Sequence, residues 1–119
     1  MKKFGKSFSV VYEIGRTKLL IAEYKVGLYY LQGKVAHQNY QLAMDWLTKA
    51  LRGSAQAQFV LGTIYEHGVD ENGRVIFNNF DKAKAMYSLA IDGGLSLAVY
   101  HLAQLYSRGL LNYNDNVPL

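Results

Sequence analysis

The chain has 119 residues, half of them hydrophobic and 18% charged, which is enough apolar content for one compact domain or a short repeat array and excludes disorder as a description of the whole chain. It contains no cysteine, which excludes disulfides, thiolate nucleophiles and zinc–thiolate sites. No apolar run is long enough to cross a bilayer, and the basic start is followed by polar residues rather than by the apolar core of a signal peptide. These features predict a cytoplasmic protein without membrane association.

The net charge of +4 lies entirely in residues 1–25, which hold six basic and two acidic side chains. The rest of the chain carries seven of each and is neutral. We interpret the N-terminal segment as a solvated basic arm that favours solubility. A contact with nucleic acid is the weaker alternative, and it predicts salt-sensitive retention on DNA or RNA that disappears when residues 1–6 are deleted.

Three segments of the chain share one pattern. They are AEYKVGLYYLQG at 22–33, AQFVLGTIYEHG at 57–68 and AVYHLAQLYSRG at 98–109, offset by 35 and 41 residues. The first Ala, the aliphatic residue four positions on and the Tyr eight positions on lie on one face of an α-helix. The Gly or Ala after the aliphatic residue lets a second helix approach closely, and the final Gly suits the left-handed conformation that ends a helix. We call this predicted helix A.

A second helical pattern follows the first two copies, at 42–53 and 82–94. Ala, a bulky pair, Ala again and a closing Gly give it one apolar face, and we call it helix B. Asn39 and either Asn79 or Asp81 are the expected N-caps because each stands just before the helical period begins. One such hairpin cannot bury its apolar faces alone, so neighbouring units must stack.

This pattern resembles the Sel-one-like repeat (SLR), a relative of the tetratricopeptide repeat. The resemblance implies an all-α protein, an α/α solenoid of about two and a half SLR helix-turn-helix units at 22–109. The second unit departs from the family pattern by five extra residues between Gly68 and Ala83, and the third stops after helix A. Members of the family are scaffolds and adaptors, and several bacterial ones take part in host or cell-envelope interactions.

The two ends carry no recognisable repeat. Residues 1–21 are expected to form a basic arm, strand-like or helical, with helix favoured as a degenerate helix B, and Thr17 is expected to cap a first helix that runs to Gln32. Residues 110–119 are rich in turn formers and predict an irregular tail. Leu110 and Leu111 either cap the last apolar face or join a second copy, which would make a homodimer through the C-terminal end.

No catalytic, cofactor or metal site is expected. His37, His67 and His101 do not have metal-ligand spacing, no serine stands in a nucleophile elbow, and the glycines close helices instead of forming a phosphate loop. The carboxylates Glu66, Asp70 and Glu71 are near in sequence but show no acid–base pattern. We therefore expect neither an enzyme nor a small-molecule substrate.

In the related tetratricopeptide fold, four positions of each helix A line the concave groove, and by this similarity each unit offers one set here. The first unit offers Ile21, Tyr24, Leu28 and Leu31; the second offers Gln56, Phe59, Thr63 and Glu66; the third offers Leu97, Tyr100, Gln104 and Ser107. The aromatic column Tyr24, Phe59 and Tyr100 is more often packing than recognition in SLR units. Leu28 and Leu31 have polar equivalents in the other units and suggest a contact site. Val75–Phe77 in the insertion is a second candidate, and a loop folded onto helix B is the equal alternative for that segment.

Two classes of function follow. The first is a small adaptor or scaffold that binds a partner peptide or domain through the concave helix-A face, expected around Tyr24, Leu28 and Leu31. The second is a cytoplasmic inhibitor, such as an immunity protein that neutralises a toxin or an enzyme. A neighbouring toxin gene would favour the second class.

Overall fold

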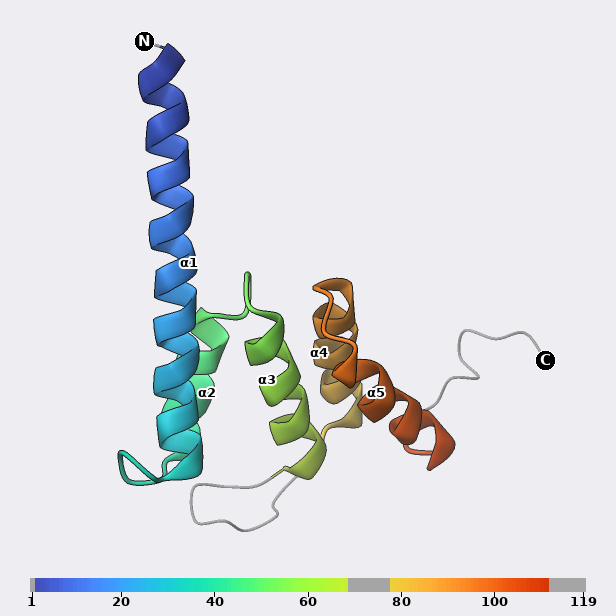
Figure 1. Cartoon of the computed structure of the whole chain (residues 1–119). Helices are drawn as coiled ribbons and strands as arrows, with labels where there is room; N and C mark the ends of the chain where they lie inside the picture. The colour runs from blue at the N-terminus through green and yellow to red at the C-terminus, as the bar shows by residue number, and fades with distance from the viewer. Residues whose placement is uncertain (1, 69–77, 112–119) are drawn as a thin grey trace, which may run out of the picture.

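The computed structural model describes residues 2–68 and 78–111, with side chains from residue 10 onward. Those residues form only helices, joined by turns (Figure 1): α1 (Lys2–Gln32), α2 (Tyr40–Lys49), α3 (Ala55–His67), α4 (Phe80–Asp92) and α5 (Leu97–Ser107). None of these helices is long and apolar enough to span a membrane. The expected all-α architecture is confirmed.

The helices pair as two hairpins and the start of a third. α1 packs on α2, α3 packs on α4, and α5 lies against α4. A smaller contact between α2 and α3 joins the two hairpins, so the helices follow one another across Figure 1 in chain order.

Asparagine side chains cap the N-termini of α2 and α4 at the positions that the sequence predicts. Asn39 Oδ1 accepts a hydrogen bond from the backbone N–H of Leu42 at 3.0 Å, and Asn79 Oδ1 accepts one from Lys82 at 3.0 Å. Both predicted N-caps are confirmed, and Asn79, rather than Asp81, caps α4. Each bond satisfies a backbone donor that has no partner within its own helix.

Glycine ends each helix A. Gly33, Gly68 and Gly109 have φ angles of 70°, 58° and 71°, in the left-handed region that a side chain disfavours. Each follows the tyrosine of its repeat by three residues. The prediction that these glycines adopt the left-handed conformation is confirmed.

The small residue in the middle of helix A lets helix B approach. A Cβ atom on Gly27 would lie 2.7 Å from Leu47 Cγ, and one on Gly62 would lie 2.6 Å from Tyr87 Cε1. The equivalent Ala103 of α5 is exposed, because no described helix packs on that side of the third unit. Close helix packing therefore explains this repeat position.

The two hairpins close in the same way although their turns differ in length. The backbone N–H of Asn39 donates to the carbonyl oxygen of Tyr30 at 2.9 Å, and that of Asn79 donates to Tyr65 at 2.8 Å. Tyr30 and Tyr65 are equivalent repeat positions. The extra residues of the second turn thus leave the hairpin unchanged; Val75–Phe77, the candidate contact segment, lie outside the described residues.

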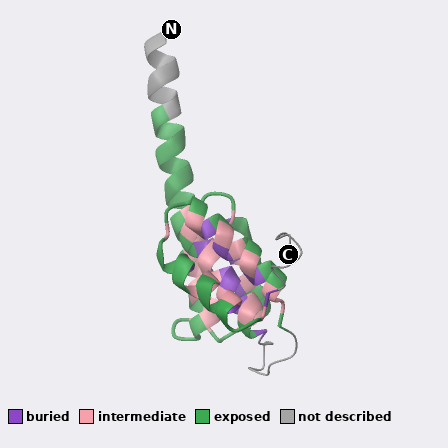
Figure 2. Ribbon diagram, turned by 90° about the vertical axis from the view of Figure 1, so that its right-hand side faces the viewer, coloured by how far each residue is buried: buried purple, intermediate pink, exposed green. Residues whose placement is uncertain are grey.

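Two clusters of buried side chains make up the core (Figure 2). One joins α2 and α3 through Leu47, Ala50, Ala57, Leu61 and Ile64. The other holds Ala83, Tyr87, Ala90, Ala98, Leu105 and Leu111. Leu111 is only 6% exposed and Leu110 packs against the same cluster, so these residues cap the solenoid from within the chain.

Residues 2–32 form one unbroken helix whose N-terminal half projects beyond the body (Figure 2). The prediction that Thr17 caps this helix is wrong, because residues 2–16 are also helical and Thr17 lies inside the helix. The same helix excludes a strand, or a separate helix B, in residues 2–21.

Candidate partner-binding groove

A groove lies between α1 and the beginning of α3. Its volume is about 360 Å³. It is lined by Thr17, Leu20, Ile21, Tyr24, Lys25, Gly53, Ser54 and Gln56. One wall is a face of α1 and the other is the turn between α2 and α3, so the groove belongs to the junction of the first two repeats.

The residues of the turn hold that second wall in place. A Cβ atom on Gly53 would lie 2.5 Å from Leu20 Cδ1, so glycine is what lets α1 close against the turn. Ser54 is 8% exposed, and its Oγ accepts a hydrogen bond from the backbone N–H of Ala57 at 3.1 Å. This cap fixes the start of α3 and with it the position of Gln56.

Three positions expected to line the concave face meet in this groove: Ile21 and Tyr24 from the first unit and Gln56 from the second. Ile21 is 50% exposed although it is a large aliphatic residue. Tyr24 is half-buried against the α2–α3 core cluster, and burial raises the pKa of its phenol. The groove thus offers apolar surface beside hydrogen-bonding groups from Tyr24, Thr17 and Gln56.

The other two candidates of the first unit lie deeper. Leu28 is half-buried, and Leu31 packs against the α2–α3 core cluster. Neither lines the groove. A polar substitution at Leu31 would therefore lower the stability of the fold in addition to any effect on binding.

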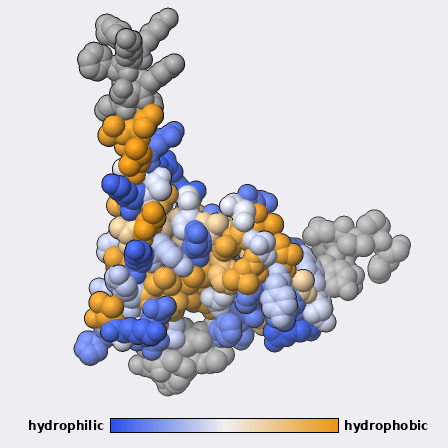
Figure 3. Space-filling model, in the orientation of Figure 1, coloured by the Kyte–Doolittle hydropathy of each residue, from blue (hydrophilic) through white to orange (hydrophobic). Residues whose placement is uncertain are grey.

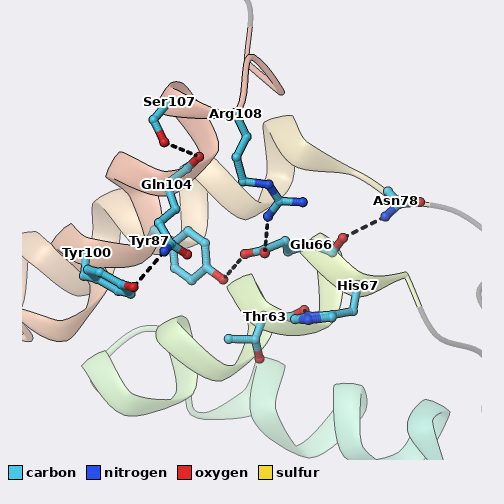
Figure 4. Close-up of polar contacts among 9 residues, drawn as sticks. All are labelled: Thr63, Glu66, His67, Asn78, Tyr87, Tyr100, Gln104, Ser107 and Arg108. Carbon is cyan, nitrogen blue, oxygen red and sulfur yellow. Dashed lines mark hydrogen bonds and ion pairs between the residues drawn. The ribbon is translucent and has the colours of Figure 1, made fainter.

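The polar candidates on α3 and α5 have partners within the chain (Figure 4). Glu66 Oε1 accepts a hydrogen bond from the Tyr87 hydroxyl at 2.7 Å, and its second oxygen lies 3.8 Å from an Arg108 guanidinium nitrogen. Gln104 Nε2 donates to the Tyr100 hydroxyl at 2.7 Å. Thr63 and Ser107 donate to backbone carbonyl oxygens of their own helices, which are those of Val60 and Gln104.

The aromatic column divides between packing and exposure. Phe59 lies 4.9 Å from the His101 ring in an edge-to-face arrangement and 5.8 Å from the ring of Tyr87. Tyr100, on α5, is 61% exposed. His101, half-buried among Phe59, Tyr87 and Tyr100, is thus a packing residue between α3, α4 and α5.

The described residues bring together no group of three or more metal-ligating side chains. His37 is exposed in a turn. The exposed His67 ring forms a hydrogen bond, through Nδ1, with the backbone oxygen of Thr63 at 2.7 Å. The strongest electrostatic effect is on Tyr87: its burial raises the pKa of the phenol well above its ordinary value, and the Glu66 carboxylate raises it further. The phenol of Tyr87 is therefore held protonated and donates its hydrogen bond to Glu66.

Several residues of the groove have no counterpart among the predicted site residues. Thr17, Leu20 and Lys25 come from α1, and Gly53 and Ser54 come from the turn. Two sequence signals point to them. The helical spacing of apolar residues on α1 continues upstream of Tyr24, and a glycine follows helix B ten residues after its first alanine in both units, at Gly53 and Gly93.

Stacked helical hairpins with a groove beside the first-repeat helix A define a short α/α solenoid, a class of repeat scaffold. The profile of the Sel1 repeat matches residues 20–54, 55–95 and 96–116, and the chain belongs to this family. Sel1 repeats generally mediate protein–protein interaction, and proteins built from them are typically non-enzymatic scaffolds. No curated protein matches the chain significantly.

Two solved structures are similar to the chain. A Sel1 repeat protein from Oxalobacter formigenes has a TM-score of 0.66 and 28% identity over 91% of this chain and 43% of its own. The protein c5321, a protective antigen of uropathogenic Escherichia coli strains that displays an SLR fold, has a TM-score of 0.42 and 27% identity over 79% of this chain and 27% of its own. The chain spans less than half the length of either relative.

Proposed function

We propose that the chain is a protein-binding adaptor that holds a segment of its partner in the groove between α1 and α3. The observation that supports this most is Ile21, a half-exposed aliphatic side chain inside a groove that also presents Tyr24 and Gln56. An aliphatic anchor flanked by hydrogen-bonding side chains is the usual composition of a contact site for a protein segment. The proposal includes no catalytic step, and it places the adaptor in the cytoplasm, in keeping with the absence of cysteine.

Two variants of α1 test the groove with a matched control. Ile21→Asp places a charge in the groove, whereas Leu19→Asp places the same charge at a residue that is 59% exposed and does not line it. Both side chains are exposed, so neither change should unfold the protein. The measurement is quantitative affinity capture from a lysate with the wild type and each variant, after circular dichroism has shown equal helix content.

We expect at least one protein to be captured by the wild type and by Leu19→Asp and to be lost with Ile21→Asp. Burying an unpaired carboxylate against an apolar contact costs a few kcal/mol, which is about a hundredfold in affinity. If every captured protein is recovered equally with the two variants, the groove is not the binding site.

A further inference from the structure

The projecting half of α1 exposes large apolar side chains. Val10, Val11, Tyr12, Ile14 and Leu19 are 56%, 68%, 60%, 52% and 59% exposed, and Figure 3 shows hydrophobic surface on this part of the helix. An isolated helix of this length is marginal in water, and Gly15 and the β-branched residues lower its helix propensity further. A cover over these side chains would stabilise the helix.

Five side chains of α1, four of them apolar, fall on one line along the helix, whereas Val11, Tyr12 and Leu19 are exposed away from it. Val10, Ile14, Thr17, Ile21 and Tyr24 are separated alternately by four and three residues, the spacing with which one helix packs along another. Thr17, Ile21 and Tyr24 also line the groove. The stripe, as we call residues 10, 14, 17, 21 and 24, therefore runs without a break from the projecting end into the groove and measures about 21 Å.

Basic side chains border the stripe on one side, and Glu13 lies on the other side, three residues after Val10 and four before Thr17. Lys18 and Lys25 follow Ile14 and Ile21 by four residues, which makes them neighbours on the helix surface. Both are exposed, and in the described part of the chain neither forms an ion pair. The position beside the core of a helix pair is where charges select the partner, and two lysines there select acidic side chains.

The same charges disfavour a second copy of the chain. In an antiparallel pair of α1 helices Lys18 and Lys25 would face lysines of the other copy. In a parallel pair Glu13 would face Lys18 of the other copy, but the basic N-terminal segments, with Lys2, Lys3 and Lys6, would lie side by side. A flat anionic membrane fits the lysines but not the groove, whose second wall at Gly53, Ser54 and Gln56 stands beside α1. A side chain projecting from a partner helix can enter this groove, whereas a bilayer surface cannot.

We propose that the stripe and the groove together bind an acidic amphipathic helix of a partner protein, laid along α1 from Val10 to Tyr24. This inference rests on the proposed function and extends it, because it specifies the chemistry of the partner and adds the projecting half of α1 to the binding surface. Leu or a similar side chain of the partner enters the groove beside Ile21. Glu or Asp side chains of the partner pair with Lys18 and Lys25.

The test uses two labelled helical peptides of about three heptads each, with Leu at the two core positions. One has Glu at the flanking positions and the other has Lys. Fluorescence anisotropy measures the binding of each to the full chain. We expect the Glu peptide to bind at least about tenfold more tightly than the Lys peptide, and we expect that preference to weaken with salt.

Three variants locate the peptide. Ile14→Asp, outside the groove, should weaken binding of the Glu peptide about tenfold or more, as loss of an apolar anchor does. Tyr12→Asp, at a residue 60% exposed on the opposite face of α1, should change it less than about twofold. The double reversal Lys18→Glu with Lys25→Glu should switch the preference to the Lys peptide, a gain of binding that an unfolded variant could not give.

Other results would overturn the inference. Equal affinity for the two peptides, no binding of either, or no effect of Ile14→Asp would do so. Dimerisation in sedimentation equilibrium that Ile14→Asp abolishes would assign the stripe to a second copy, and binding of phosphatidylserine vesicles without binding of the Glu peptide would assign it to a membrane. Loss of binding with Ile21→Asp but not with Ile14→Asp would reject the extension and leave the proposed function standing.

Discussion

Glu66 and Tyr87 illustrate how single side chains join the elements of this solenoid. The Tyr87 ring is fully buried on α4, and its hydroxyl donates to the Glu66 carboxylate on α3 at 2.7 Å. Arg108, which follows α5, approaches the same carboxylate at 3.8 Å but is well exposed, so this ion pair adds little. The hydrogen bond, made at a buried phenol, is the stronger of the two contacts.

The raised pKa of Tyr87 has a consequence at alkaline pH. A group whose pKa is higher in the folded state adds stability that is complete below its ordinary pKa, near 10 for tyrosine, and is lost as the pH rises above that value. The free energy of unfolding of the wild type should therefore fall above about pH 10. Tyr87→Phe should be less stable at pH 7 by about 1–3 kcal/mol, and the difference from the wild type should shrink as the pH rises. Urea denaturation across this range checks both; a constant difference would contradict the account.

Replacing glycine by alanine should have different effects on stability at two helical positions, Gly62 and Gly15. Gly62 faces Tyr87 so closely that Gly62→Ala should destabilise the fold by about 1–3 kcal/mol, because the buried ring has to move. Gly15, in the projecting half of α1, has no atom within 4 Å of an added Cβ, so Gly15→Ala should raise helix propensity and not lower stability. Urea denaturation of the two variants compares them, and equal losses would show that the close approach at Gly62 carries no cost.

At the scale of elements, α1 combines two environments in one helix. Its C-terminal half is packed on α2, where Gly27 is buried and Leu31 joins the core cluster. Residues 10–19 of its N-terminal half are exposed throughout. A helical segment is protected from exchange by tertiary packing more than by its own propensity.

The backbone amides of residues 10–16 should therefore exchange with solvent at least about tenfold faster than those of residues 24–31. Hydrogen exchange followed by nuclear magnetic resonance gives the two sets of rates. Addition of the Glu peptide should slow exchange in residues 10–16, because the bound helix covers the stripe. Equal protection of the two halves in the free chain would contradict the assignment of the packing to one half.

Those features of the fold that depend on residues close together in the chain could be predicted from the sequence. Helical periodicity, the left-handed glycines and the asparagine caps depend on residues within a few positions of one another, so the repeat pattern was enough to place them. The prediction of Thr17 as an N-cap was wrong because threonine is also found inside a helix when the residues on both sides of it are helical. Whether Leu111 capped the chain or joined a second copy depended on the packing around α4 and α5, which sequence spacing does not define.

The candidate site was harder to predict for the same reason. Glu66 has an ordinary groove position in its repeat, and only the stacking of α4 reveals that Tyr87 binds its carboxylate. The wall formed by Gly53 and Ser54 belongs to the turn between repeats, where the repeat pattern assigns no binding position. Ile21, Tyr24 and Gln56 were predicted because the helix-A positions carry over from a related fold.

At the scale of the whole molecule, the chain is a short solenoid in which the apolar stripe of α1 is exposed beside a groove. The capped end at Leu111 and the groove at the first repeat lie at opposite ends of the stack (Figure 1). The central claim is that a partner protein lies in this groove. This claim requires the partner to contact both walls of the groove, which are α1 and the turn between α2 and α3.

The most direct test is a titration of the isotope-labelled chain with the partner recovered by affinity capture, followed by nuclear magnetic resonance. The account predicts shifts of the amide signals of Thr17, Ile21 and Lys25 on one wall and of Gly53, Ser54 and Gln56 on the other. Leu42 on α2 and Leu89 on α4, which are exposed away from the groove, should be unaffected. Shifts confined to α2 and α4, with the two walls unchanged, would contradict the claim.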